Sequence, residues 1–379
     1  MALAFLRRWL LLFAAFFAVT IPLQYRELPS PGYWLRPWLE SGLRAVAGGW
    51  LAPADGALFS DSPGLYWYAV ALLAATALVA GLWLALARRT PATEARLWYV
   101  LHTGAAWFLA LQLLEYGFDK VFKHQFYLPE PNTLYTPLGM LPPDLAYWSV
   151  MGASRSYSVF AGVLEVVPAA LLLFRRTRLL GGLLAVAVLA NVLALNIGFE
   201  ITVKLWSGFL LALAAVVAAP GLRTVYCGLV RASWHPPALP PRPASLHGRW
   251  AGAVRGLLVG ILLLETAGSF MRDGALNDDL APRPLLHGAY VVVSGASPVK
   301  RVFVHRQGYF ITQTADDSLR SYQLTYASGC LLLRDETGHP GALRYTVDSA
   351  GLHLTGTLGA DSVRWLARPL PWRQLPLLQ

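Results

Sequence analysis

One apolar stretch of the sequence carries a concentration of ionisable side chains. Residues 113–126 read LLEYGFDKVFKHQF, and the ionisable ones are Glu115, Asp119, Lys120, Lys123 and His124. On a helix, residues four apart share a face, so Glu115, Asp119 and Lys123 form one polar stripe and Lys120 with His124 forms another. Two interpretations remain open. One is a helix end at the membrane surface, with salt bridges and snorkelling lysines, and the other is a polar cluster in which a lysine of lowered pKa acts as a base.

Glu165 is a second ionisable residue in apolar surroundings, because residues 159–168 read VFAGVLEVVP. A carboxylate inside a membrane-spanning helix is costly unless it faces the interior of a helix bundle. Glu165 is therefore expected either to pair with a cation, Lys120 or Arg155, or to be protonated and hydrogen-bonded. A structural ion pair and a proton carrier are both consistent with this position.

Amide side chains extend the list of candidate binding residues. Asn191 and Asn196 lie in an apolar segment, where amides commonly form hydrogen bonds between helices. Glu200 and Lys204 follow with the spacing and order that favour an ion pair on a helix. Other apolar segments contain the isolated polar residues His102, Gln112 and Glu265, which are expected to be packing residues. No two histidines lie on segments that would face each other as haem ligands.

The motifs of several enzyme classes are missing. The sequence has no nucleotide-binding loop, no zinc-protease motif and no nucleophile elbow in a fitting context. The two cysteines, Cys227 and Cys330, are far apart in sequence and lack the spacing of zinc ligands. A disulfide between them is not expected, because the topology predicted below places them on opposite sides of a membrane.

The composition requires a membrane. Hydrophobic residues make up 56% of the 379 residues and charged residues only 14%, and the mean hydropathy is +0.47. Such a chain has more apolar surface than a soluble core can bury. The net charge of +10 comes from short basic clusters between apolar runs, which is typical of membrane topology signals and argues against nucleic acid as a partner.

About seven windows have the length and hydrophobicity of a membrane-spanning helix, which needs about 20 residues. They lie near 7–23, 65–87, 97–117, 157–174, 179–198, 202–219 and 252–270. The first resembles a signal peptide without a convincing cleavage site, so we expect an uncleaved first helix.

Arginine clusters fall on alternate loops and predict the orientation. They are Arg7/Arg8, Arg88/Arg89/Arg96, Arg175/Arg176/Arg178 and Arg223/Arg231/Arg242/Arg249. By the positive-inside rule these loops are cytoplasmic. The longer loops at 24–64 and 118–156 are richer in Pro, Trp and Tyr, which suits the external side. We expect a multi-pass protein of a bacterial inner membrane, with a cytoplasmic N-terminus and an extracytoplasmic C-terminal domain.

The apolar periodicity changes after about residue 275, where short alternating runs are separated by Gly, Asp, Ser and Pro. This pattern predicts an antiparallel meander that forms a small barrel or sandwich. The expected segments are two N-terminal spans in 1–94, a four-helix membrane bundle in 95–222, a Pro-rich cytoplasmic linker in 223–250, a last span in 251–274 and a β-rich domain in 275–379. The fold class is therefore mainly α membrane protein with a small C-terminal β-domain.

Several short motifs in the middle of the chain resemble the DoxX-like membrane family. They are Gly117-Phe-Asp-Lys120 at the end of one span, Phe160-Ala-Gly-Val-Leu-Glu165 in the next, LLLFRRTRLLG at 171–181 and Asn191-Val-Leu-Ala-Leu-Asn196. The resemblance covers about residues 95–222. It implies a four-helix membrane bundle with a G-x-x-K motif before an external loop, and a link to redox complexes such as a thiosulfate:quinone oxidoreductase.

The G-x-x-K motif and the glutamate-bearing span also resemble the transmembrane domain of the vitamin K-dependent gamma-carboxylase group. In that group a lysine acts as base on a reduced quinone, which by analogy implies a similar role for Lys120. This chain departs from both patterns, because it has additional spans and a much smaller β-domain, and it lacks carboxylase signatures. These departures leave the reaction open.

Two functions from different classes follow. In the first, the bundle binds a quinone or another lipophilic redox molecule, with Lys120 as base or anion partner and Glu165 as its counter-charge. Glu115 and Asp119 would form the rim, and the further binding residues would be Lys123, His124, Arg155, Asn191 and Asn196. In the second, the bundle is a non-enzymatic anchor that presents the β-domain to an envelope protein or to lipid. A proton-coupled transporter ranks below both. It would require polar groups at midplane depth on several spans and broken helices, whereas the predicted spans are unbroken apart from Pro168.

Overall fold

The computed structural model describes residues 1–21, 24–47, 58, 60–87, 90–233, 239–241, 250–295, 298–359 and 361–379. Residues 234–238 and 242–249 of the expected linker 223–250 lie outside these residues, as do four arginines of the topology signal, Arg88, Arg89, Arg242 and Arg249. The chain forms two compact units. We call them the helical unit, Met1–Phe122 with Val159–Leu276, and the barrel unit, Lys123–Ser158 with Asn277–Gln379.

Seven helices in the described residues are long and apolar enough to cross a membrane, as the sequence predicts. They are α1 (Ala2–Thr20), α3 (Pro63–Leu86), α4 (Pro91–Val121), α7 (Arg155–Leu173), α8 (Arg178–Gly198), α9 (Lys204–Arg231) and the last span, Ala251–Arg272. Large apolar side chains such as Leu78 and Leu82 are 72% and 62% exposed. These surfaces suit contact with lipid, and the protein is an integral membrane protein.

Local sequence explains where these helices start and stop. Proline at the first position follows a capping residue in α3 and α4, where Ser62 and Thr90 accept hydrogen bonds from the backbone N–H groups of Leu65 and Thr93. With 31 residues, α4 is about 46 Å long at 1.5 Å per residue. α9 continues to Arg231, into the segment expected to be linker.

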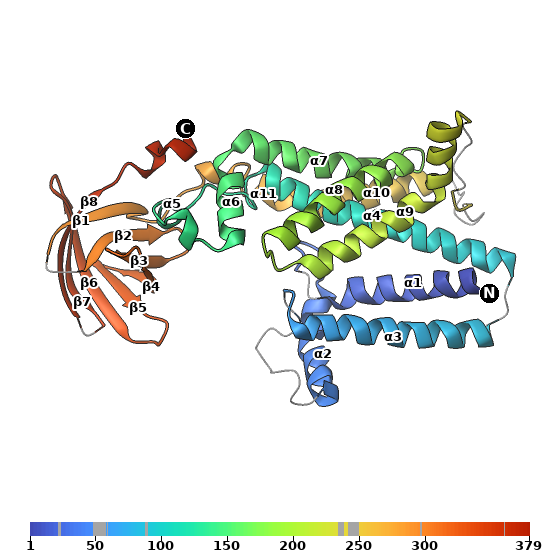
Figure 1. Ribbon diagram of the computed structural model, residues 1–379, viewed down its shortest axis with the longest axis horizontal. Helices are drawn as coiled ribbons and strands as arrows, with labels where there is room; N and C mark the ends of the chain where they lie inside the picture. The colour runs from blue at the N-terminus through green and yellow to red at the C-terminus, as the bar shows by residue number, and fades with distance from the viewer. Residues whose placement is uncertain are drawn as a thin grey trace. The chain divides into compact units, whose positions relative to one another are not determined.

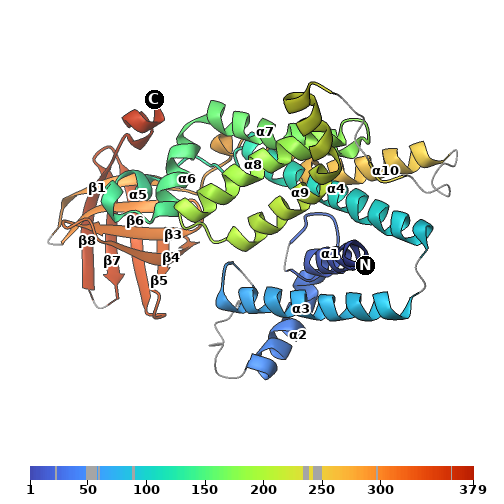
Figure 2. The ribbon, with the colours of Figure 1, turned by 45° about the vertical axis from the view of Figure 1, so that its right-hand side comes forward.

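The segment between α1 and α3 contains a helix where the sequence predicts only a loop. α2 (Pro31–Ala47) runs across α1 and α3 (Figures 1 and 2). Its aromatic residues Trp34 and Trp38 are 66% and 78% exposed. Exposed tryptophans on a helix that lies across the spans suit the polar–apolar boundary of a bilayer.

The last span is not a regular α-helix. α10 (Ala251–Leu263) leads into a π-helical turn, η4 (Leu264–Gly268), and then into α11 (Ser269–Arg272). The span stays continuous through this turn, from Ala251 to Arg272. π-helical turns are rare and often lie at functional sites.

The C-terminal strands form a closed eight-stranded antiparallel barrel in simple sequence order. The strands are β1 (Gly288–Ser294), β2 (Val299–His305), β3 (Tyr309–Thr314), β4 (Leu319–Ala327), β5 (Cys330–Arg334), β6 (Pro340–Asp348), β7 (Gly351–Leu358) and β8 (Asp361–Pro369). β1 closes the barrel on β8, with Tyr290 opposite Pro369 and Val291 opposite Arg368. Alternate residues such as Phe310, Leu331 and Leu343 fill the interior. The predicted β-domain is therefore a barrel and not a sandwich.

A second apolar cluster covers the outer face of β1 to β3. It contains Phe303, Ile311 and Trp372, with Leu128 and Leu134 packed against it. Leu134 ends the short helix α5 (Pro131–Leu134), and α6 (Pro143–Ala153) follows in the same segment. The compact unit around the barrel is therefore larger than the predicted segment 275–379, because residues 123–158 belong to it.

Candidate functional site

Two glycines bring α4 and α7 into close contact. A Cβ atom added at Gly162 would lie 2.5 Å from the Gly117 carbonyl oxygen, and one added at Gly117 would lie 2.7 Å from Cγ2 of Val166. Small residues at facing positions are a common means of close helix approach in membranes. The two backbones are thereby close enough for long side chains of opposite charge near the crossing to meet.

Lys120 and Glu165 meet at this crossing. The ammonium group of Lys120 donates to both carboxylate oxygens of Glu165, at 3.0 and 2.8 Å. Both residues are buried, with exposed fractions of 8% and 4%. Of the partners that the sequence left open for Glu165, the structure selects Lys120.

Polar groups continue along the face of α4 that carries Lys120, because Gln112 and Tyr116 precede it at intervals of four residues. The Tyr116 hydroxyl accepts a hydrogen bond from Nε1 of Trp206 at 3.0 Å. Gln112 is 1% exposed, and its Nε2 atom has no hydrogen-bond partner among the described residues. A buried amide donor without an acceptor is costly, so this face has a hydrogen-bond donor that the described residues leave unsatisfied.

Asp119 pairs with Arg26, a residue that no sequence motif indicated. A guanidinium nitrogen of Arg26 binds Oδ1 of Asp119, and the guanidinium stacks on Phe270 at 4.0 Å from the ring centre. Arg26 follows α1 by a few residues, so its distance in sequence from Asp119 hid the pair. Asp119 is thus part of an ion pair that links the α1 end to α4.

Glu265 was expected to be a packing residue, and the structure gives it a more specific role. Its two carboxylate oxygens accept hydrogen bonds from three successive backbone N–H groups, those of Arg26, Glu27 and Leu28, at 2.6, 2.8 and 2.6 Å. Glu265 is 1% exposed and lies in the π-helical turn. The π-helical turn thus carries a carboxylate that fixes the loop after α1.

Carboxylates outnumber cations in this part of the helical unit. The carboxylates are Glu115, Asp119, Glu165 and Glu265, and the cations beside them are Arg26 and Lys120. Burial, together with the negative charges of Glu115 and Glu265, raises the pKa of Tyr25 above its ordinary value. The cluster therefore contains more acidic groups than basic groups to pair with them.

Three predicted binding residues belong to the barrel unit and not to this cluster. Lys123 is buried, donates to the Gly152 carbonyl oxygen and lies 3.5 Å from a carboxylate oxygen of Asp279. Burial lowers its pKa from the ordinary value, against the opposing effect of Asp279. Arg155 is exposed and adds its charge to the field at Lys123. His124 also lies in the barrel unit.

The two predicted asparagines differ in their hydrogen bonds. Nδ2 of Asn196 donates to the Ser207 hydroxyl at 3.0 Å, which joins α8 to α9. Asn191 is exposed on α8 and makes no hydrogen bond to another described residue, so the expected bond between helices is not formed there. Lys204 pairs with Asp61 at 3.7 Å in place of the predicted Glu200.

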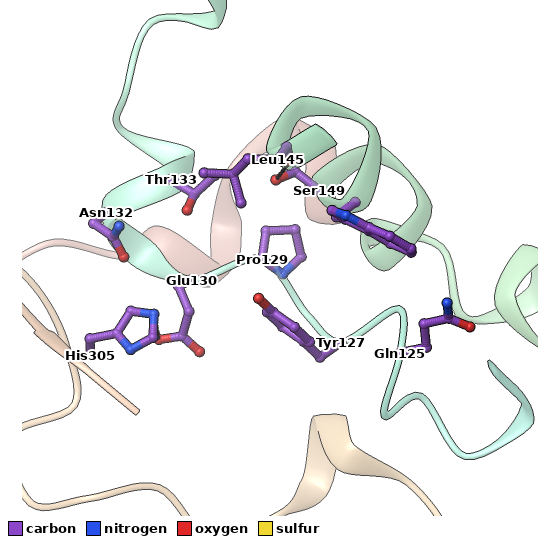
Figure 3. Close-up of a pocket in the computed structure, with 10 residues that line it drawn as sticks. Gln125, Tyr127, Pro129, Glu130, Asn132, Thr133, Leu145, Ser149 and His305 are labelled. Carbon is purple, nitrogen blue, oxygen red and sulfur yellow. Dashed lines mark hydrogen bonds and ion pairs between the residues drawn. The ribbon is translucent and has the colours of Figure 1, made fainter. Parts of the chain in front are cut away.

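A separate cavity of about 120 Å³ lies in the barrel unit beside Glu130 (Figure 3). The Glu130 carboxylate is 3.0 Å from Nε2 of His287 and 3.7 Å from Nε of Arg306. Two buried amide oxygens that line the cavity, those of Gln125 and Asn132, have no hydrogen-bond partner among the described residues. The cavity has the size and polarity to hold a few ordered waters.

Comparisons with known proteins give one weak similarity. No family model matches the chain, and no solved structure matches it. The uncharacterised protein YwoB of Bacillus subtilis (strain 168) is 28% identical over 119 residues, which cover 29% of this chain and 70% of YwoB. The name of that relative gives no activity, so the function has to be inferred from the geometry of the site.

Proposed function

We propose that the helical unit binds the polar head of a quinone or a similar lipophilic redox molecule beside Lys120 and Glu165. The observation that carries this proposal is the buried polar face of α4, which combines the Lys120–Glu165 pair with the unpartnered amide donor of Gln112. A quinone ring carries carbonyl acceptors and an apolar tail, so it can enter from the bilayer and take hydrogen bonds from these donors.

Each residue then has a role in binding. The Lys120 ammonium donates to a carbonyl oxygen of the ligand or stabilises an anionic form, and Glu165 orients the ammonium and balances its charge. Asp119, held by Arg26, and Glu115 form the rim and can exchange protons with it. The chain would act as the quinone-binding subunit of a membrane oxidoreductase, with the electron donor on another subunit.

The cellular placement and the family are part of the proposal. Arginine clusters at the ends of the spans support an inner-membrane protein whose barrel unit is extracytoplasmic. The residues Gly117, Lys120 and Glu165 support membership of the DoxX-like family, because the first allows the helix contact at which the other two meet.

Extraction of bound small molecules tests the proposal. The purified full-length protein, Lys120→Ala and Glu165→Gln are extracted with organic solvent, and quinones are quantified by mass spectrometry. We expect a quinone in the wild type at near one equivalent and a loss of at least tenfold in both variants, because each removes a charge-assisted hydrogen bond. Lys204→Ala is the matched control, since Lys204 also pairs with a carboxylate but lies outside the cluster. Equal quinone content in all four samples, or none in any, would refute the proposal.

A second candidate function is supported by the barrel. Its mouth contains a cavity of about 570 Å³ lined by Tyr322, Trp365, Val363 and the cation Arg320. Asp361 and several hydroxyl groups also line it, so the cavity combines apolar side chains with one cation and one anion, which fits a lipid or another amphiphile with a polar head. The helices would then anchor the barrel, which would present this cavity to an envelope protein or to lipid. A bound lipid that is lost in Arg320→Gln and retained in Lys120→Ala would favour this function.

A further inference from the structure

A cavity of about 310 Å³ in the helical unit gathers three arginines. It lies where α4 passes the turn between α7 and α8 and the beginning of α10, and its cations are Arg175, Arg178 and Arg255. None of the described residues that line it is acidic. Within the part of the chain that the structure describes, none of the three guanidinium groups has a carboxylate within 4.0 Å. The cavity therefore has a strong positive potential and lacks a counter-charge.

Arg178 is only 6% exposed, so water cannot compensate its charge in place of a carboxylate. Its Nε donates to the Leu172 carbonyl oxygen and its Nη1 to the Thr103 hydroxyl, both at 3.2 Å. These bonds orient the guanidinium but do not neutralise it. By contrast, the buried Arg8 has Glu94 at 2.7 Å. A buried charge without a partner is strongly destabilising, so the site needs an anion from outside the chain.

Two helix N-termini add to the positive potential and oppose the C-terminus of α7, whose Leu172 carbonyl lies at Arg178. α8 begins at Arg178 and α10 at Ala251, so two helices direct their N-terminal N–H groups toward this region. The N-terminus of a helix favours anions, phosphate groups in particular. Arginine is also the side chain best suited to bind phosphate through two parallel hydrogen bonds.

The rest of the lining is suited to lipid. The aromatic residues are Tyr99, Trp107 and Trp250, the types enriched at the level of the head groups. The wall formed by Val254 and Leu258 of α10 continues onto an exposed apolar surface, since these residues are 53% and 43% exposed. A phosphate in the cavity would thus be followed directly by a surface for acyl chains.

We propose that this cavity binds the phosphate head group of an anionic phospholipid from the membrane leaflet that contains the α7–α8 turn. Arg178 forms the buried end of the site, and Arg175 and Arg255 close on the phosphate from two other helix ends. Basic pockets between membrane helices are known to take such head groups. The bound lipid supplies the negative charge that the described residues lack.

Titration of the full-length protein in detergent with phosphatidylglycerol or phosphatidylcholine, followed by native mass spectrometry, tests the site. We expect the wild type to bind phosphatidylglycerol at least tenfold more tightly. Arg175→Gln and Arg255→Gln should each weaken that binding about tenfold or more, because each loses a hydrogen bond between charged groups. Both positions avoid the buried Arg178, whose replacement could unfold the bundle, and thermal midpoints without lipid verify the fold.

Arg176→Gln is the matched control. Arg176 lies in the same turn, is exposed and does not line the cavity, so its replacement should leave the affinity unchanged. An equal loss in Arg176→Gln would refute the site, because general surface charge would then explain binding. Equal affinity for phosphatidylcholine would refute the preference for an anionic lipid. Displacement of the lipid by inorganic phosphate at millimolar concentration would show that the anion is free phosphate and would overturn the lipid assignment.

Discussion

At the scale of single residues, the Lys120–Glu165 pair combines two opposing free-energy terms. Moving both charges from water into the bundle costs several kcal/mol per ion, and their mutual attraction recovers that cost only while both are present. Both residues are less than one-tenth exposed. The pair as a whole therefore adds little to the net stability of the protein, but each buried charge is stable only while its partner is present.

Replacing one partner of the pair should destabilise the protein more than replacing both. We expect Lys120→Met or Glu165→Leu alone to lower the free energy of unfolding by about 3–5 kcal/mol, because an unpaired charge remains buried. The double variant should recover most of that loss. Thermal unfolding in detergent, followed by light scattering, measures the series. Lys204→Met, which removes a more exposed partner, should cost about 1 kcal/mol or less, and a double variant no more stable than the singles would contradict this account.

Glu130 and His305 should make the stability of the barrel unit depend on pH. Against burial, hydrogen bonding and the charges of His287 and His305 lower the pKa of Glu130 below its ordinary 4.5. Burial lowers the pKa of His305 below 6.5, although Glu130 opposes this. In both cases the unfolded state binds protons more readily, so acidification destabilises the fold.

The barrel unit should lose stability on acidification in two steps. As pH falls below about 6.5, unfolded His305 takes up a proton first, and as pH falls below about 4.5, unfolded Glu130 does so. Urea unfolding of the barrel unit, followed by tryptophan fluorescence from pH 7.5 to 3.5, measures both steps. His305→Gln should flatten the upper step and Glu130→Gln the lower one. Stability that rises on acidification between pH 6.5 and 4.5 would reverse the assigned sign.

At the scale of elements, the α4–α7 crossing positions the site. Glycine at 117 and 162 removes the side chains that would separate the two backbones. This contact places Lys120 and Glu165, one turn further along each helix, within hydrogen-bond distance. The crossing and the ion pair are therefore linked, since a change of spacing between the helices would separate the charges.

Gly117→Ala tests this link. The added methyl group would meet Val166 and the Gly162 backbone, so we expect a loss of about 1–3 kcal/mol in stability from overpacking, together with reduced ligand content. Gly104→Ala is the control on the same helix, because nothing lies within 4 Å of its added Cβ, and alanine should gain about 0.5–1 kcal/mol there. If the thermal midpoint changes equally in the two variants, the crossing is not tightly packed at Gly117.

At the scale of the whole molecule, the barrel unit is assembled from two separate parts of the chain. The segment that joins α4 to α7 supplies Leu128, Leu134 and Tyr135, which cover an apolar patch on the outside of the barrel around Phe303 and Ile311. It also supplies Glu130, the partner of His287. A closed barrel with one apolar outer face is incomplete without this cover.

A fragment of residues 277–379 should therefore expose apolar surface and self-associate when produced alone. We expect it to bind the dye ANS and to form oligomers, because the patch around Phe303 is exposed to water. Fusion to residues 123–158 through a flexible linker should restore a monomer with low dye binding, measured by gel filtration and fluorescence. A fusion with Leu134→Asp serves as the control and should remain oligomeric. A monomeric, dye-free 277–379 fragment would contradict the proposed cover.

Length and periodicity were enough to predict the spans and the strands, since about 20 apolar residues or alternating short runs leave few alternatives. The Lys120–Glu165 contact was one of the open alternatives for Glu165, suggested by the cost of a lone buried charge. For other contacts, no local sequence pattern predicted the partner. The bonds of Glu265 go to backbone N–H groups far away in sequence. Lys123 does not continue the helical stripe expected with Glu115 and Asp119, since α4 ends at Val121 and Lys123 has a φ of +64°. Barrel closure depends on β1 meeting β8, which no short pattern encodes.

The bond between Glu265 and the loop after α1 also sets an order of events during synthesis. α1 can enter the membrane as soon as it leaves the ribosome, but the backbone of Arg26 must wait for an acceptor that lies 239 residues later in the chain. Arg26 meets Asp119 earlier, 93 residues on. α1 can pack against α3 and then α4, but the loop after α1 is fixed only when the last span arrives. A nascent protein that stalls before residue 265 would therefore leave this N-terminal loop exposed to cellular quality control.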